Sequence, residues 1–244
     1  MLLKDKVSLI TGAARGIGKS IALDFANEGS DLILADIDPD ELDKTCRFIG
    51  KSADVKVVPV VADISKEDDV INLFKTAGQN FKRLDILVNN AGIHIFKSTL
   101  KTTLEEWDRV LDINLRGTFL CCKEALKIMT SRNYGKIINI SSDVGKKGEA
   151  MQAAYCASKA GIIALAETLA DEFNDYNINI NSVLPHSVDT DLLRNSFPEL
   201  EYSKFIKPAD VSKVVLFLAS DHSSAIKGAA IEVYNGQNLG KNWF

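Results

Sequence analysis

The stretch Thr11-Gly12-Ala13-Ala14-Arg15-Gly16-Ile17-Gly18 decides the fold, because it joins a short β-branched run to a long helical pattern. The run before it, Val7–Thr11, predicts a buried strand, and the pattern after it predicts a helix over Gly16–Glu28. Glycines permit a tight turn and a close approach of another group to the backbone. The first turn of the helix presents unpaired N–H groups that attract an anion. The sequence therefore predicts a strand–turn–helix unit suited to the pyrophosphate of a dinucleotide.

The same alternation of short strands and longer helices continues along the chain. Strands are predicted at Val7–Thr11, Asp31–Asp36, Val55–Val61, Leu84–Asn89, Lys136–Ser141, Ile178–Leu184 and Ala230–Tyr234. Helices are predicted near Gly16–Glu28, Asp40–Ile49, Lys66–Phe81, Thr103–Thr130, Ala153–Tyr176 and Pro208–Ser220. Such alternation requires crossover connections, and so predicts an α/β protein of the Rossmann-type, doubly wound kind. Its seven-stranded, mostly parallel sheet has helices on both faces and binds ligands beyond the carboxyl ends of the strands.

Length and composition fit one domain over residues 1–244, because the 244 residues contain no low-complexity linker or internal repeat. The segment Asp191–Lys207 is the least regular, and we expect a short substrate flap there. The net charge of −4 argues against a nucleic-acid partner. No uncharged apolar run approaches the roughly 18 residues of a membrane helix.

Cysteine usage bears on location and on metals. The four cysteines have no C-x-x-C spacing and no grouping with histidine; they are Cys46, Cys121, Cys122 and Cys156. We therefore expect no metal site and a reducing, cytoplasmic environment.

The end of the second predicted strand indicates which dinucleotide would bind. Asp36 lies eighteen residues after Gly18, near the spacing at which a carboxylate meets the adenosine ribose. A 2′-phosphate there would be repelled by Asp36, and the next residue is Ile37 rather than a cation. These residues favour NAD over NADP. Arg15 is the contrary signal, because it can pair with a 2′-phosphate, although we expect it to be a solvated residue near the helix start.

A group of side chains farther along suggests acid–base chemistry. Tyr155 and Lys159 stand at i and i+4, which puts both on one face of a helix about 6 Å apart. A free tyrosine titrates near pH 10, and the charges of Lys159 and of an oxidised nicotinamide would stabilise its phenolate. Ser142 would hydrogen-bond the substrate oxygen, and Asn114 would hold a water that relays protons. Each residue alone is more often structural, but their order matches successive carboxyl ends of a parallel sheet.

These residues resemble the short-chain dehydrogenase/reductase family over nearly the whole chain, from Thr11 to Gly236. The resemblance implies that Asn114, Ser142, Tyr155 and Lys159 are the catalytic tetrad. It also implies a cofactor site made of the glycine motif Gly12, Gly16 and Gly18 with Arg15 and Ile17, of Asp36 and Ile37, of Asp63 and Ile64 at the adenine, of Asn90, Ala91 and Gly92 after Asn89, and of Pro185, Val188 and Thr190 beside Tyr155 and Lys159. Hydride would pass to or from the nicotinamide ring, and members commonly assemble as homotetramers.

Departures from the family pattern concern the substrate side. His186 follows Pro185 where the family usually has glycine, and Tyr234-Asn235-Gly236 replaces the common Asp-Gly-Gly. Either His186 is a substrate contact whose charge switches, or the loop merely tolerates it. His94 and Gln152 would border the substrate with Ser142. Lys146 and Lys147 would attract an anionic substrate or be solvated.

The leading functional hypothesis is therefore an oxidoreductase that interconverts a secondary alcohol and a ketone with a nicotinamide cofactor. A 3-oxoacyl thioester and a sugar or polyol are both open as substrates. The alternative is a non-catalytic, dinucleotide-sensing interaction protein.

Overall fold

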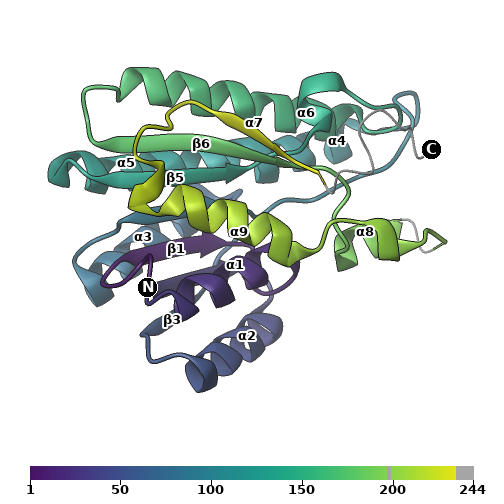
Figure 1. The fold of residues 1–244 in the computed structure, drawn as a ribbon. Coiled ribbons are helices and arrows are strands. Elements are labelled where there is room, and N and C mark those ends of the chain that lie inside the picture. The colour runs from purple at the N-terminus through teal and green to yellow at the C-terminus, as the bar shows by residue number, and fades with distance from the viewer. Residues whose placement is uncertain (197–198, 235–244) are drawn as a thin grey trace.

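The computed structural model describes residues 1–196 and 199–234. In that part of the chain seven strands form one sheet in the order β3-β2-β1-β4-β5-β6-β7. Every neighbouring pair is parallel. The strands are β1 (Val7–Thr11), β2 (Asp31–Asp36), β3 (Val57–Val61), β4 (Ile86–Asn89), β5 (Gly135–Ile140), β6 (Ile178–Pro185) and β7 (Ala230–Val233). The predicted Rossmann-type, doubly wound sheet is confirmed (Figure 1).

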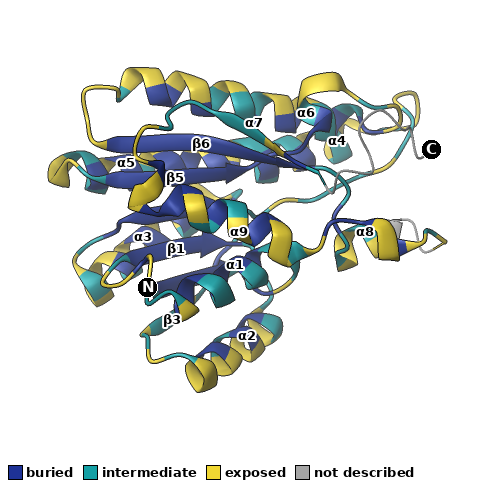
Figure 2. Ribbon diagram, in the orientation of Figure 1, coloured by how far each residue is buried: buried dark blue, intermediate teal, exposed yellow. Residues whose placement is uncertain are grey.

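Helices cover both faces of this sheet. They are α1 (Gly16–Asn27), α2 (Pro39–Ser52), α3 (Glu67–Phe81), α4 (Leu104–Leu111), α5 (Gly117–Arg132), α6 (Val144–Lys147), α7 (Ala153–Glu172), α8 (Asp191–Ser196) and α9 (Pro208–Ala219). Successive strand residues point to opposite faces, so Ile10 packs in the cluster with α1, α2 and α9, whereas Leu9 packs in the cluster with α3, α5 and α7. The strands at the centre of the sheet are buried along their length (Figure 2).

The predicted helix Thr103–Thr130 is wrong as a single element. The structure divides this region into α4, a π-helical turn η1 (Asp112–Arg116) and α5. Within it the Thr118 hydroxyl donates a hydrogen bond to the carbonyl oxygen of Asn114 at 2.7 Å. Hydrophobic periodicity does not distinguish one π-helical turn from a continuous α-helix, and such turns are frequent at functional sites. The predicted helix Ala153–Tyr176 also ends earlier than expected, because α7 stops at Glu172.

The connections leave a crevice at the carboxyl edge of the sheet. The chain runs outward from β1 to β2 and β3, then crosses to β4 on the other side of β1. Ligands of open α/β sheets bind where the strand order reverses in this way. Segment 191–207, the predicted flap, contains α8 and the 3-10 turn η2 (Tyr202–Lys204). Residues 197–198 of that flap, and Asn235-Gly236, lie outside the described residues.

The flap is fastened at its two ends by one carboxylate. Asp189 accepts a hydrogen bond from Arg194 Nε at 2.6 Å and one from Lys207 Nζ at 2.9 Å. Just before it, Val188 forms an isolated parallel bridge with Ile206. The two ends of the flap are therefore held side by side next to the end of β6.

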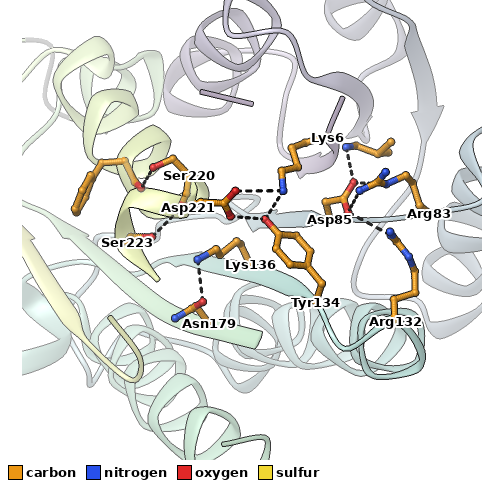
Figure 3. Close-up of polar contacts among 12 residues, drawn as sticks. Lys6, Arg83, Asp85, Arg132, Tyr134, Lys136, Asn179, Ser220, Asp221 and Ser223 are labelled. Carbon is orange, nitrogen blue, oxygen red and sulfur yellow. Dashed lines mark hydrogen bonds and ion pairs between the residues drawn. The ribbon is translucent and has the colours of Figure 1, made fainter. Parts of the chain in front are cut away.

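The opposite edge of the sheet is closed by a cluster of polar side chains (Figure 3). Asp85, fully buried at the start of β4, accepts hydrogen bonds from the backbone N–H of Val7 at 2.9 Å and from Arg83 and Arg132 at 2.7 and 3.2 Å. Beside it, Lys6 Nζ donates to the Tyr134 hydroxyl at 2.6 Å. These bonds tie the amino-terminal ends of β1, β4 and β5 together.

Across residues 1–196 and 199–234, no helix is both long and apolar enough to cross a lipid bilayer.

Candidate active site

A cavity of about 660 Å³ opens at the carboxyl edge of the sheet. Its lining includes all the residues predicted to bind the cofactor except Gly18, namely Gly12, Arg15, Gly16, Ile17, Asp36, Ile37, Asp63, Ile64, Asn90, Ala91, Gly92, Tyr155, Lys159, Pro185, Val188 and Thr190. The four predicted substrate residues, His94, Ser142, Gln152 and His186, line it too. The topology thus gathers nearly all of the residues that the sequence singled out into one space.

The glycine turn is shaped by close backbone contacts. Gly12 and Gly16 have φ angles of +65° and +55°, a region that side chains disfavour. A Cβ at Gly12 would lie 2.8 Å from the Cα of Ala91, and one at Gly18 would overlap the carbonyl oxygen of Gly12. Asn90 Nδ2 donates to the carbonyl oxygens of Thr11 and Gly12 at 3.0 and 2.9 Å. Gly18 therefore packs against the Gly12 carbonyl group outside the cavity, whereas Gly12 and Gly16 line the cavity.

The carboxylate of Asp36 is fixed at the far wall of the cavity by backbone donors. Its Oδ2 accepts the N–H of Ala14 at 2.9 Å, and its Oδ1 accepts the N–H of Asp38 at 3.1 Å. Each oxygen keeps a second lone pair for another donor. Ile37 beside it is 66% exposed, so the carboxylate has an open approach. Both oxygens can therefore accept a further hydrogen bond from a group in the cavity.

Arg15 is half-exposed, as expected, but it is also paired. Its Nη2 forms an ion pair and a short hydrogen bond with Asp38. Asp38 also caps α2, because its Oδ1 accepts the N–H of Glu41 at 3.2 Å. Sequence reasoning missed Asp38, although an aspartate directly before proline at a helix start was a visible signal.

Tyr155 and Lys159 lie at the other end of the cavity, on the first turns of α7. Burial raises the pKa of the Tyr155 phenol above its ordinary value. Burial also lowers the pKa of Lys159 to about 8. The Lys159 Nζ lies 5.5 Å from the centre of the Tyr155 ring and donates to the carbonyl oxygen of Ile140 at 2.8 Å. The ammonium group is therefore beside the phenol without bonding to it.

Asn114 is the one predicted catalytic residue that does not line the cavity. It is fully buried in the π-helical turn, and its Nδ2 donates to the Ile93 carbonyl oxygen at 2.9 Å and to the Ser158 hydroxyl at 3.1 Å. Its Oδ1 accepts the N–H of Ile93 at 2.8 Å. Both amide hydrogens are thus used, so the side chain holds the backbone after Gly92 in place. That Asn114 also holds a water in a proton relay stays a prediction.

His94 and Gln152 form a pair against the ring of Tyr155. The His94 Nε2 and the Gln152 Oε1 are 2.8 Å apart, and the His94 ring meets the Tyr155 ring edge-on at 4.7 Å. Burial lowers the pKa of His94, so the imidazole is neutral at pH 7 and donates its Nε2–H to Gln152. This pair restricts the orientation of the phenol.

Asp143 is a buried charge beside Ser142 that sequence reasoning missed. Its Oδ2 lies 2.8 Å from His186 Nδ1 and 2.9 Å from Lys147 Nζ, and its Oδ1 accepts the Ser142 hydroxyl at 3.2 Å. Lys146 pairs in turn with Glu232 at 2.7 Å. Both lysines predicted to attract an anionic substrate are therefore already paired within the protein. The signal for Asp143 was its position directly after Ser142 at a strand end.

Known proteins are similar to this chain over most of its length. A family model described as short chain dehydrogenase matches residues 6–201. A 3-oxoacyl-[acyl-carrier-protein] reductase of Thermotoga maritima is 36% identical, covering 97% of this chain and 99% of that protein. A trans-4-hydroxycyclohexanecarboxylate dehydrogenase of Sinomonas cyclohexanicum is also 36% identical, covering 98% and 95%. The crystal structure of a levodione reductase superposes with a TM-score of 0.92 at 32% identity, covering 96% of this chain and 98% of that one. The chain therefore belongs to the short-chain dehydrogenase family, whose members are oxidoreductases that use a nicotinamide cofactor.

Proposed function

We propose that this oxidoreductase interconverts a secondary alcohol and a ketone with NAD as its preferred cofactor, and that Tyr155 is its acid–base group. One observation carries the proposal. A single cavity has the fixed carboxylate of Asp36 at one end and Tyr155, Ser142 and Lys159 at the other. A dinucleotide site and a group that transfers protons are therefore joined in one space.

The residues present fit a dinucleotide. The contacts at Gly12 and Gly18 leave no room for side chains, so the turn presents its backbone and the start of α1 to a pyrophosphate. Ile64 and Asp63 would border the adenine, and the segment with Val188 and Thr190 would hold the nicotinamide amide. When bound, the nicotinamide ring accepts or supplies the hydride.

Preference for NAD is supported by the charges around Asp36. Arg15 is already paired with Asp38, the next carboxylate after Asp36 in the sequence. A 2′-phosphate would enter a region with excess negative charge and find the guanidinium engaged. The ribose of NAD instead brings hydroxyl donors to Asp36.

The chain's own groups would handle the proton. In ketone reduction the Tyr155 hydroxyl donates its proton to the substrate oxygen, and in alcohol oxidation the phenolate accepts it back. Ser142 hydrogen-bonds the same oxygen. Burial raises the pKa of Tyr155, so the phenol suits the acid role, and the nearby Lys159 cation supports the phenolate needed for oxidation.

The test follows NADH absorbance with a panel of substrates and both cofactors. The panel should contain an acetoacetyl thioester and a polyol, which represent the two substrate classes left open by the sequence. It should also contain a cyclic hydroxycarboxylate, the kind of compound named for one relative. The Tyr155→Phe variant is expected to lose about 10²–10⁴-fold in turnover while calorimetry shows unchanged NAD binding. Full activity in that variant would refute the proposed mechanism. NAD binding without turnover on any substrate would support the dinucleotide-sensing alternative.

We also propose a homotetramer in the reducing cytoplasm. An apolar groove formed by α4, η1, α5 and α7 supports a subunit contact; it is lined by Leu111, Leu115, Phe119 and Leu165 with Asp112 and Arg116. The four cysteines are free thiols, which suits a reducing compartment. Light scattering of the purified protein distinguishes a tetramer from a dimer.

A further inference from the structure

The bridge between Asp143 and His186 joins two loops of the candidate active site. Asp143 follows Ser142 at the end of β5, and His186 follows Pro185 at the end of β6. Besides the side-chain bond of 2.8 Å, the Asp143 N–H donates to the Pro185 carbonyl oxygen at 3.3 Å. The loop with Ser142 is therefore tied to the segment that continues to Val188, where the nicotinamide is proposed to lie.

The Asp143 carboxylate is ionised and takes three donors. Burial alone would raise its pKa, but the hydrogen bonds from His186 and Lys147 outweigh burial and hold the pKa below its usual value. An ionised carboxylate only accepts hydrogen bonds, so in its contact with Ser142 at 3.2 Å the serine hydroxyl is the donor. Asp143, and at a longer 3.5 Å the Pro185 carbonyl oxygen, thus compete for the single hydrogen that Ser142 can give to Tyr155 or to a substrate oxygen.

The surroundings of His186 favour the tautomer with its hydrogen on Nδ1. Its Nδ1 faces the carboxylate, and its Nε2 is buried with no hydrogen-bond partner in residues 1–196 and 199–234. With the hydrogen on Nδ1, only a lone pair is buried without a partner at Nε2. The other tautomer would bury an N–H without an acceptor, which costs more free energy.

We infer that Asp143 and His186 are positioning residues, which fix the Ser142 loop against the segment after β6 and set how much of the Ser142 hydrogen remains for the reaction. The inference rests on the proposed function, in which Ser142 and Tyr155 act on the substrate oxygen. The negative charge of Asp143 also opposes ionisation of Tyr155. Asp143 therefore both competes for the Ser142 hydrogen and opposes ionisation of the phenol. His186 and Lys147 weaken these two effects, because each lies within hydrogen-bonding distance of the carboxylate.

Other titratable groups near this bridge must stay the same in every variant whose pH profile is compared. They are Cys156 beside Tyr155 on α7, Lys146 paired with Glu232 of β7, and Tyr234, whose ring lies 5.4 Å from that of His186. Near Tyr155 there are also His94 and Lys159. Substitutions at Asp143 and His186 leave all of these in place, so a change in the pH profile can be assigned to the bridge.

The kinetic test compares kcat/KM for alcohol oxidation against pH in three variants. Asp143→Asn removes the charge and leaves a neutral, weaker acceptor for the Ser142 hydrogen. The rising limb should therefore move to lower pH, with about a threefold to tenfold gain on that limb. His186→Ala leaves Asp143 less compensated and should move the limb to higher pH. His186→Asn keeps an N–H donor near the carboxylate and should restore the original profile. Profiles that coincide for all the folded variants would overturn the inference.

A second arm does not depend on turnover. The chain has three histidines, so the ring nitrogens can be assigned by nitrogen NMR with His94→Gln and His222→Gln variants. The Nδ1–H tautomer is expected for His186 in the protein without cofactor, and an Nε2–H tautomer would contradict the bridge. If the unaltered protein turned over no substrate, the proposed function would fail, while this arm would still decide whether the bridge exists.

Discussion

Lys159 is expected to reduce the stability of the fold at neutral pH. Its side chain is only 4% exposed, and burial lowers its pKa from 10.5 to about 8. An unfolded chain binds the same proton more tightly, and each unit of difference in pKa corresponds to about 1.4 kcal/mol. At pH 7 the buried ammonium therefore costs about 3 kcal/mol of the free energy of unfolding.

Replacing Lys159 by methionine, which has a similar volume, removes this cost. The variant also loses the hydrogen bond to the Ile140 carbonyl oxygen, which is worth about 1 kcal/mol. We therefore expect Lys159→Met to unfold with a free energy about 2 kcal/mol higher at pH 7, while its turnover is lost.

The sign of the pH dependence is the decisive feature. Below pH 8 Lys159 is protonated in both the folded and the unfolded chain, so the full cost is present. Between pH 8 and 10.5 the folded protein loses the proton first, and the cost disappears. The advantage of the methionine variant should shrink by about 3 kcal/mol over this range and end slightly below zero.

Urea unfolding of the cofactor-free proteins at pH 7, 9 and 10.5 measures this difference. Groups that titrate in both proteins cancel in the comparison. Lys75→Met, at an exposed position of α3, controls for the loss of a surface charge. A difference between the Lys159 variant and the unaltered protein that stayed constant with pH would refute the reasoning.

Three further predictions concern separate parts of the molecule. Gly18→Ala puts a methyl group against the Gly12 carbonyl oxygen and should weaken NAD binding about tenfold or more by calorimetry, so unchanged affinity would contradict the packing account. Asp38→Asn keeps the cap of α2 but frees Arg15, and should raise NADP affinity relative to NAD about fivefold; the gain should vanish when Arg15→Ala is added. Asp85→Ala leaves the two arginines of Figure 3 facing no carboxylate and should lower the free energy of unfolding by about 3–5 kcal/mol, with turnover per folded molecule unchanged.

The sequence was most informative where a backbone requirement limits the choice of residue. The glycines after β1 and the carboxylate at the end of β2 are constrained by the turn and by its donors, and the structure places both where the pattern predicted. The strand pattern likewise predicted the presence of all seven strands, because short β-branched runs bounded by turn residues are distinctive.

The sequence was least informative where side chains from distant segments meet. The partners of Asp143 and Arg15 are set by crossover connections that bring 143 to 186 and 15 to 38, and no local pattern encodes such pairs. The π-helical turn around Asn114 was missed for a different reason, since one inserted residue hardly alters the apolar spacing. In that turn the side chain of Asn114 bonds to Ile93 and Ser158.

The polar cluster around Asp85 and the candidate active site lie at opposite ends of the strands, and β1 connects the two. Its first residue, Val7, bonds to Asp85, and its last, Thr11, receives the N–H groups of Asn90 and Ala91. Four steps along a strand separate these ends by roughly 13 Å, a distance at which substitutions usually act independently. Substitutions that raise the stability of the fold can therefore be sought around Asp85, while substitutions that change the substrate range are sought in the cavity. Stability gained around Asp85 should offset stability lost through changes in the cavity.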